Sequence, residues 1–180
     1  MFARLKTFFS SKSKESDNEP FFRYQAILEI IKRDFKIDFY GDHGIYHWQR
    51  VYLNTQKLAQ YYGVESDVFE LFALLHDSKR EDEYKDIGHG KRAGEFVKSL
   101  IEKELIKLDD VDEERLIYAC QNHTVSNKSN PLYDDLIVQI CFDSDRLDIG
   151  RVGITPERKY FLTDFAKEYI QNSSMDRIQF

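Results

Sequence analysis

Apolar residues recur along this chain at the spacing of amphipathic helices. From Pro20 onward they follow steps of three and four residues, and strict alternation of apolar and polar positions is rare. With only three Pro and eight Gly in 180 residues, little interrupts such helices. We therefore predict an all-α fold without internal repeats, a single-domain helical bundle of about seven helices. The predicted helices span residues 20–35, 44–62, 65–77, 89–106, 111–124, 132–149 and 156–171.

Capping residues mark several of these helix boundaries. Acidic, hydroxyl and proline residues are favoured at helix N-termini, and glycine is favoured just after a C-terminus. Gly63 follows the second predicted helix, and Pro156 opens the last one. Further start signals lie at the third, fifth and sixth helices, namely Ser66, Asp67, Asp110, Asp112 and Pro131.

The first 19 residues differ from the rest of the chain. Four basic residues precede the first acidic one, and serines are crowded between residues 10 and 16. We predict a flexible, basic and Ser-rich tail over residues 1–19 and a folded domain over 20–180. A transit peptide or a weak surface anchor is the alternative for the tail, because a short apolar stripe runs through it.

The composition narrows the class of protein. The chain carries 26 Lys+Arg and 32 Asp+Glu, and its net charge of −6 disfavours a protein that grips long nucleic acid by bulk charge. No stretch reaches the ~18 apolar residues that span a membrane. The two cysteines form neither a disulfide framework nor a C-x-x-C motif. We expect a protein of the reducing cytoplasm.

Histidine and aspartate residues fall on the apolar faces of the predicted helices, close to their ends. His47 begins an apolar stripe that continues with Val51, and His76 ends a stripe that includes Phe72. Asp77 directly follows His76, and the apolar faces of the fourth, fifth and sixth predicted helices carry His89, His123 and Asp145. Each histidine alone could be a hydrogen-bonded core residue, but burying carboxylates among several imidazoles is costly. A divalent metal compensates, because it binds imidazole nitrogen and carboxylate oxygen together.

In this pattern of His, His-Asp and Asp, the chain resembles the HD-domain superfamily of metal-dependent phosphohydrolases. The resemblance runs from about residue 43 to residue 153 and rests on the segments HGIYHWQRV, LLHDSKRE and SDRLD. It implies an HD-type helical bundle that holds a divalent ion, one of Mn, Fe, Co, Ni, Zn or Mg. The implied metal ligands are His47, His76, Asp77 and Asp145.

The resemblance also implies a second ion. His89, in GHGKRAG, and His123, in CQNHT, fall where binuclear members carry two further histidines. With Asp77 as the bridging ligand, one or two ions would bind per chain. The alternative is that these two imidazoles contact the substrate. A direct role for His43 stays open, because the glycines beside it suggest a loop.

Catalytic roles follow from the same resemblance. Asp77 would hold the ion and orient its water, and Arg50, three residues after His47, would meet the substrate phosphate. Glu81 and Asp82 resemble the acidic pair after HD in the guanosine tetraphosphate hydrolases, although that pair comes one residue earlier there. A solvated acidic loop is the alternative for them. Other basic residues near the motifs supply positive potential or are simply exposed, namely Lys79, Arg80, Arg146 and Arg151.

We therefore predict a metal-dependent phosphohydrolase that acts on a small phosphorylated metabolite, with a nucleotide as the expected substrate. The sequence leaves open whether that substrate is a phosphomonoester or a phosphodiester, which metal is native, and the oligomeric state. Two other classes stay open. One is a non-catalytic HD domain that senses a nucleotide or scaffolds partners, and the other is a di-iron oxygenase with nearly the same ligands.

Overall fold

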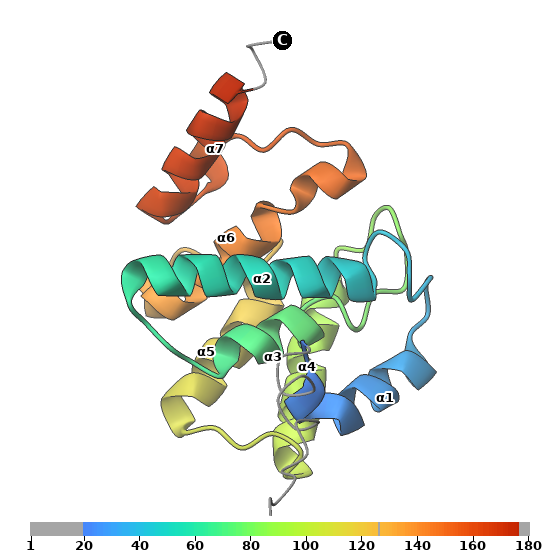
Figure 1. Cartoon of the computed structure of the whole chain (residues 1–180). Helices are drawn as coiled ribbons and strands as arrows, with labels where there is room; N and C mark the ends of the chain where they lie inside the picture. Colours follow the sequence, from blue (N-terminus) through green and yellow to red (C-terminus); the bar gives the residue numbers. More distant parts are fainter. Residues whose placement is uncertain (1–19, 126, 177–180) are drawn as a thin grey trace, which may run out of the picture.

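A computed structural model of the protein describes residues 20–125 and 127–176 (Figure 1). These residues form seven α-helices and no strand, so the predicted all-α bundle is confirmed. The helices are α1 (Gln25–Asp34), α2 (Ile45–Tyr62), α3 (Val68–Leu75), α4 (His89–Glu102), α5 (Asp110–Asn122), α6 (Leu136–Arg146) and α7 (Asp164–Asp176). Short 3₁₀ helices span Phe22–Tyr24, Pro131–Asp134, Ile149–Val152 and Arg158–Tyr160. The tail predicted over residues 1–19 lies outside the described residues.

Helix α3 lies in the middle of the bundle (Figure 1), and every one of its residues is buried. A helix that is buried on all sides must be covered by other helices, and α2, α5 and α6 pack against it. Its one charged residue, Glu70, accepts hydrogen bonds from the Phe21 amide at 2.9 Å and from Arg23 Nη2 at 2.7 Å. These bonds attach the segment before α1 to α3, and α1 begins at Gln25, later than the predicted residue 20.

Several helix ends follow the predicted capping signals. Gly63 ends α2 in the left-handed region (φ 65°), where its N–H bonds two carbonyls of the last turn. Ser66 Oγ accepts a hydrogen bond from the Val68 amide at 3.1 Å, and α3 begins there. Helix α4 ends at Glu102, earlier than the predicted residue 106, because Glu104 turns the chain at φ 57°.

The single helix predicted over 132–149 is wrong, because Asp135 interrupts it. Asp135 has an extended backbone (φ −70°, ψ 129°), and its carboxylate accepts a hydrogen bond from the Ile137 amide at 2.9 Å. It is the N-cap of α6, and Pro131–Asp134 form a separate 3₁₀ helix before it. An aspartate that bonds the amides ahead of it starts a helix and does not continue one.

The helix predicted over 156–171 begins later than expected, because Asp143 binds the preceding segment. The fully buried Asp143 carboxylate accepts hydrogen bonds from the amides of Leu162, at 3.0 Å, and Thr163, at 2.7 Å. These bonds attach an extended segment to α6, so α7 begins only at Asp164. The residues before α7 therefore form a wall beside the end of α6.

One hydrophobic core draws residues from all seven helices. Helix α7 lies at the edge of the bundle (Figure 1), where it contacts α2 and the 3₁₀ helix Arg158–Tyr160. Within residues 20–125 and 127–176, no helix is both long enough and apolar enough to cross a membrane.

Candidate metal centre

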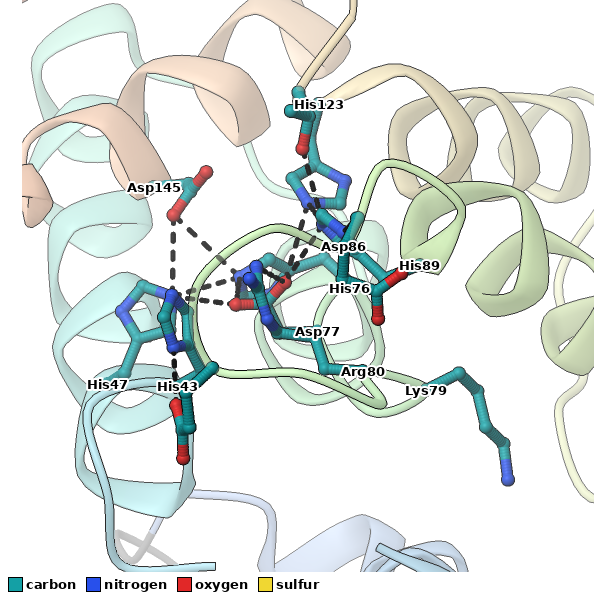
Figure 2. A network of polar contacts seen from close by, with 12 residues as sticks. His43, His47, His76, Asp77, Lys79, Arg80, Asp86, His89, His123 and Asp145 are labelled. Carbon is teal, nitrogen blue, oxygen red and sulfur yellow. Dashed lines mark hydrogen bonds and ion pairs between the residues drawn. The ribbon is translucent and has the colours of Figure 1, made fainter. Parts of the chain in front are cut away.

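Five helix ends bring the predicted metal ligands together (Figure 2). His47 lies in the first turn of α2, and His76 and Asp77 directly follow α3. His89 is the first residue of α4, His123 directly follows α5, and Asp145 lies in the last turn of α6. The apolar faces that the sequence predicted hold these helices in the core, and their ends place the polar side chains at one locus.

The predicted ligands form two groups that share Asp77. We call His47, His76 and Asp145, together with Asp77 Oδ2, the first group. In it, His47 Nε2 lies 3.0 Å from His76 Nε2, 3.3 Å from Asp145 Oδ1 and 3.7 Å from Asp77 Oδ2. His76 Nε2 lies 3.9 Å from Asp77 Oδ2 and 3.8 Å from Asp145 Oδ1. Three of its ligand atoms, one each from His47, His76 and Asp77, lie within 4.8 Å of one another, as a metal site requires.

The second group consists of His89 and His123 together with Asp77 Oδ1. His89 Nε2 lies 2.8 Å from His123 Nε2 and 3.2 Å from Asp77 Oδ1. His123 Nε2 lies 3.6 Å from the same oxygen. The three ligand atoms again lie within 4.8 Å of one another. The two oxygens of Asp77 therefore face different histidine pairs, which is the arrangement of a bridging carboxylate.

Hydrogen bonds at Nδ1 fix the orientation of all four imidazoles. The acceptors are the Asp148 carboxylate for His47 and main-chain carbonyls of Phe72, Asp86 and Cys120 for His76, His89 and His123. Carboxylate and carbonyl oxygens only accept hydrogen bonds, so each neutral ring carries its proton on Nδ1. Each Nε2 then presents a lone pair to the centre. Lone pairs 2.8–3.0 Å apart repel one another unless a cation lies among them.

The pKa shifts at this locus favour a neutral His76 and an ionised Asp77, and they favour positive charge at His47. Burial lowers the pKa of His76 to about 3, so this ring is neutral. Burial also lowers the pKa of His47, but the carboxylates of Asp145 and Asp148 outweigh it and the pKa is raised. Burial raises the pKa of Asp77, but the surrounding imidazoles outweigh it and hold the pKa well below its usual range.

Asp77 Oδ1 gives an independent sign that a cation belongs here. Within residues 20–125 and 127–176, it is the one buried side-chain nitrogen or oxygen atom without a hydrogen-bond partner. An unsatisfied buried polar group costs about 1–3 kcal/mol, and more when it is charged. A divalent ion between Asp77, His89 and His123 would satisfy this oxygen. The mixture of imidazole and carboxylate ligands fits Mn, Fe, Co, Ni or Zn.

A cavity of about 1540 Å³ lies against the centre. Asp77, His89, His123 and Asp145 line it, whereas His47 and His76 lie behind them, fully buried. The segment between α6 and α7 forms another part of its wall. A ligand in the cavity would therefore meet the second group and the two carboxylates directly.

Arg50, expected at the substrate phosphate, does not line this cavity. Its Nε donates to Asp148 Oδ1 at 2.7 Å, and 44% of its side chain is exposed. Asp148 binds His47 through its other oxygen at 2.7 Å. Asp148 thus pairs with both His47 and Arg50, and Arg50 contacts the partner of a predicted ligand rather than the cavity.

Glu81 and Asp82 are both exposed, and neither lines the cavity. Glu81 accepts a hydrogen bond from Lys36 Nζ at 2.6 Å. Asp82 accepts hydrogen bonds from main-chain amides of the following turn, including that of Tyr84 at 2.7 Å. In this structure both carboxylates stabilise the loop after α3, as the alternative of an acidic loop described.

Glu83, like Asp86, is an acidic residue of this loop that lines the cavity. Its Oε2 lies 2.8 Å from Nδ1 of His43, a buried side chain that also lines the cavity. The loop before α2 folds tightly, since a Cβ on Gly44 would lie 2.0 Å from the Phe39 carbonyl oxygen. Sequence reasoning did not single out Glu83. For its partner His43, the spacing of four residues before His47 was the available signal.

The basic residues near the motifs separate into two kinds. The Lys79 ammonium lies 3.8 Å from the centre of the Phe96 ring, and Figure 2 shows it pointing away from the ligands. Arg146 Nη1 donates to the Tyr160 carbonyl at 2.8 Å. Arg146 also lines the cavity, but of these four residues only Arg80 and Arg151 place a terminal nitrogen within 4.0 Å of an Asp77 oxygen. The sequence had no means to separate these two from the others, because all four lie close to motif residues.

The sequence matches no protein-family model and no curated protein. Among solved structures, the fold is similar to that of a predicted HD superfamily hydrolase from an uncultured Thermotogales bacterium. The TM-score is 0.64, the sequence identity is 24%, and the alignment covers 86% of this chain and 87% of that chain. The resemblance expected from the His and Asp motifs thus holds for the fold, and this chain has the all-α fold of a predicted HD superfamily hydrolase.

Proposed function

We propose that the protein is a metal-dependent phosphohydrolase that acts on a small phosphorylated compound. The main support is that four Nε2 lone pairs and the unpartnered Asp77 Oδ1 converge beside a cavity. This arrangement has no evident structural purpose, because it buries hydrogen-bond acceptors and an ionised carboxylate together without donors to satisfy them. The solved structure of similar fold is itself described as a predicted hydrolase, which agrees with the proposal.

Some of the predicted ligands would hold the ions from behind, and others would hold them at the wall of the cavity. Divalent ions in the two groups would supply a water of lowered pKa, near ~7, and would polarise a phosphoryl oxygen. His47 and His76, fully buried, form the rear of the centre. Asp77, with one oxygen in each group, fixes the distance between the groups, and Asp145 adds a second carboxylate at the cavity wall.

We assign proton transfer to Nε2 of His43. Glu83 holds Nδ1 of this ring at 2.8 Å, and no described residue makes a hydrogen bond to Nε2. The His43 ring lies edge-on to the His47 ring, 6.5 Å away between centroids, so it adjoins the first group. Nε2 can therefore accept a proton from the attacking water, or return one to the leaving oxygen.

We infer further that the substrate is a nucleotide, because the cavity is large and lined in part by aromatic side chains. Ligand pockets for small molecules span roughly 300–1,000 Å³, and this cavity of about 1540 Å³ exceeds that range. Tyr84, Tyr133 and Tyr160 line it and offer ring faces to a base. An inorganic anion or a short sugar phosphate would leave most of this space empty.

Metal content and turnover test the proposal together. Protein purified without chelator or nickel affinity should contain one or two equivalents of a transition metal by mass spectrometry, and His76→Ala should contain less. The metal-loaded protein should hydrolyse members of a nucleotide panel. If it binds metal but turns over no phosphate ester, a sensing or scaffolding domain replaces the enzyme. Oxygen consumption by the ferrous protein would indicate the oxygenase.

The role of His43 has its own test. His43→Gln should lower kcat by about 100-fold at unchanged metal content, because general acid–base catalysis contributes 10²–10⁴-fold. Glu83→Gln should have a smaller effect in the same direction, since its amide oxygen can still accept from Nδ1. Turnover within about 3-fold of wild type in His43→Gln would remove this residue from the mechanism.

A further inference from the structure

Two guanidinium groups with little exposed surface lie beside opposite oxygens of the shared carboxylate. Arg80 Nη1 lies 3.6 Å from Asp77 Oδ1, the oxygen of the second group. Arg151 Nη2 lies 4.0 Å from Asp77 Oδ2, the oxygen of the first group, and its Nη1 lies 3.9 Å from Asp145 Oδ1. Each half of the centre thus has one arginine beside it, and the two come from distant parts of the chain.

Both arginines are anchored through Nε and keep terminal donors unused. Arg80 Nε donates to the Asp82 carbonyl at 3.3 Å, and Arg151 Nε donates to the Asp42 carbonyl at 2.9 Å. Arg151 Nη1 also donates to a main-chain carbonyl, at 3.2 Å. No described residue makes a hydrogen bond to Arg80 Nη1, Arg80 Nη2 or Arg151 Nη2.

These free donors face the cavity. Each side chain is 9% exposed, and both residues line the cavity. If a terminal nitrogen were completely buried, it would be a buried atom without a hydrogen-bond partner, and among the described residues only Asp77 Oδ1 is such an atom. The small exposure that remains therefore includes the unbonded donors, and it opens toward the cavity.

Burying a guanidinium 3.6–4.0 Å from its nearest carboxylate is a poor arrangement for stability alone. Arg50 shows the contrast, since its Nε is 2.7 Å from Asp148 Oδ1. The guanidinium fork matches two oxygens of a phosphoryl group, and such charge-assisted bonds are roughly twice as strong as neutral ones. A phosphoryl group in the cavity would give both forks the partner they lack.

Charge favours a phosphomonoester over a diester at this site. A monoester phosphate has its second pKa near ~6, so at neutral pH it carries close to two negative charges, whereas a diester carries one. A terminal phosphoryl group also offers three non-bridging oxygens, enough for the centre and for donors on both sides. A diester has two such oxygens, and its second organic substituent would have to fit beside one of the arginines.

We propose that Arg80 and Arg151 clamp the terminal phosphoryl group of a phosphomonoester and select it over diesters. This inference rests on the proposed phosphohydrolase function and narrows its substrate class. Arg80 would meet the phosphoryl group on the side of the second group, and Arg151 on the side of the first. Both are substrate-binding residues whose donors also stabilise the charge that develops on the phosphoryl oxygens.

The first test compares two substrates on the full-length protein loaded with Mn²⁺. We expect kcat/KM for 4-nitrophenyl phosphate to exceed that for bis(4-nitrophenyl) phosphate. Arg80→Gln and Arg151→Gln should each lower the monoester value by about 100-fold, as loss of a charge-stabilising donor does, and the diester value by less than about 10-fold. Arg33→Gln, whose side chain is 72% exposed on α1, is the matched control and should change neither.

The second test measures binding without turnover. Inorganic phosphate, titrated into the Mn²⁺-loaded protein by calorimetry, should bind at least about 10-fold more weakly to each Gln variant at unchanged Mn²⁺ content. Arg80→Lys and Arg151→Lys, which keep the charge but lose the fork, should recover part of the affinity. If circular dichroism shows that a Gln variant is unfolded, the Lys variant of the same arginine takes its place in the test.

The outcomes separate the clamp from the hydrolase. Equal losses on both substrates, or a wild-type preference for the diester, would overturn the clamp and leave the phosphohydrolase standing. If neither ester and no nucleotide of the panel is hydrolysed, the proposed function fails, and phosphate binding then tests the clamp. The clamp would be overturned if the wild type bound no phosphate. It would also be overturned if the Gln and Lys variants of each arginine bound phosphate as tightly as the wild type.

Discussion

The two groups of the centre share one carboxylate but differ in depth and charge. In the first group, His47 and His76 have no exposed surface and do not line the cavity. In the second group, His89 and His123 are 3% and 5% exposed and do line it. The first group has a further carboxylate, Asp145, within 3.3 Å of an imidazole nitrogen, whereas the second has only Asp77.

This difference assigns different tasks to the two groups. More negative charge and less access to water both favour tight, permanent binding of a cation by the first group. The second group offers fewer charges and more access, so its ion should exchange more readily and stand closer to the substrate. With an ion in each group, the centre would have one structural half and one half that faces the cavity.

The largest effect is expected from removing the shared carboxylate. Asp77→Ala takes a ligand from both groups at once, so metal content should fall in both. Activity should drop by about 1000-fold or more, since several kcal/mol of charge stabilisation are lost. Circular dichroism should show an intact fold. Turnover that survives at wild-type level would contradict the role of Asp77.

The order of metal release tests the comparison itself. On dialysis against increasing chelator, the ion of the second group should leave first, at a concentration lower by roughly 10-fold or more, because that group has one carboxylate fewer. His123→Ala should abolish this first step and retain the second, measured by mass spectrometry. His76→Ala should remove the tightly held equivalent. Release of both ions in one step from the wild type would show that the groups do not differ.

Asp148 tests the comparison further, because among the four predicted ligand imidazoles only His47 has a carboxylate as its Nδ1 partner. Asp148→Ala should weaken binding at the first group by about 10–100-fold, the usual cost of losing a group that orients a ligand. Binding at the second group should stay within about 3-fold of wild type. Competition with a chromophoric chelator measures both constants. An equal loss at the two groups would indicate a general structural effect.

Arg50 should give the smallest effect. Its side chain is 44% exposed and contacts the centre only through Asp148, so Arg50→Gln removes an ion pair worth about 1 kcal/mol or less. We expect kcat/KM to fall by less than about 5-fold. A loss near that of Asp77→Ala would place Arg50 at the substrate after all.

The amino-acid sequence by itself determined the helices, and it predicted the polar residues that gather at their ends. Apolar spacing of three and four residues fixes the buried face of each helix, and histidines such as His47 and His76 continue those faces. Burying such residues requires compensation, so the sequence also predicted a metal. The prediction of the helices succeeds because periodicity is a property of a local stretch of chain, whereas the metal stays a prediction that rests on the cost of burial.

Only the tertiary structure decided which other residues serve the centre. Asp148 binds His47 from 101 residues away, and Arg151 reaches the Asp42 carbonyl across 109 residues. Asp143 likewise delays the start of α7 by binding amides 19 and 20 residues downstream. Such contacts depend on how the helices pack, because no local spacing records which charged side chain a folded chain places inside and which it leaves in water.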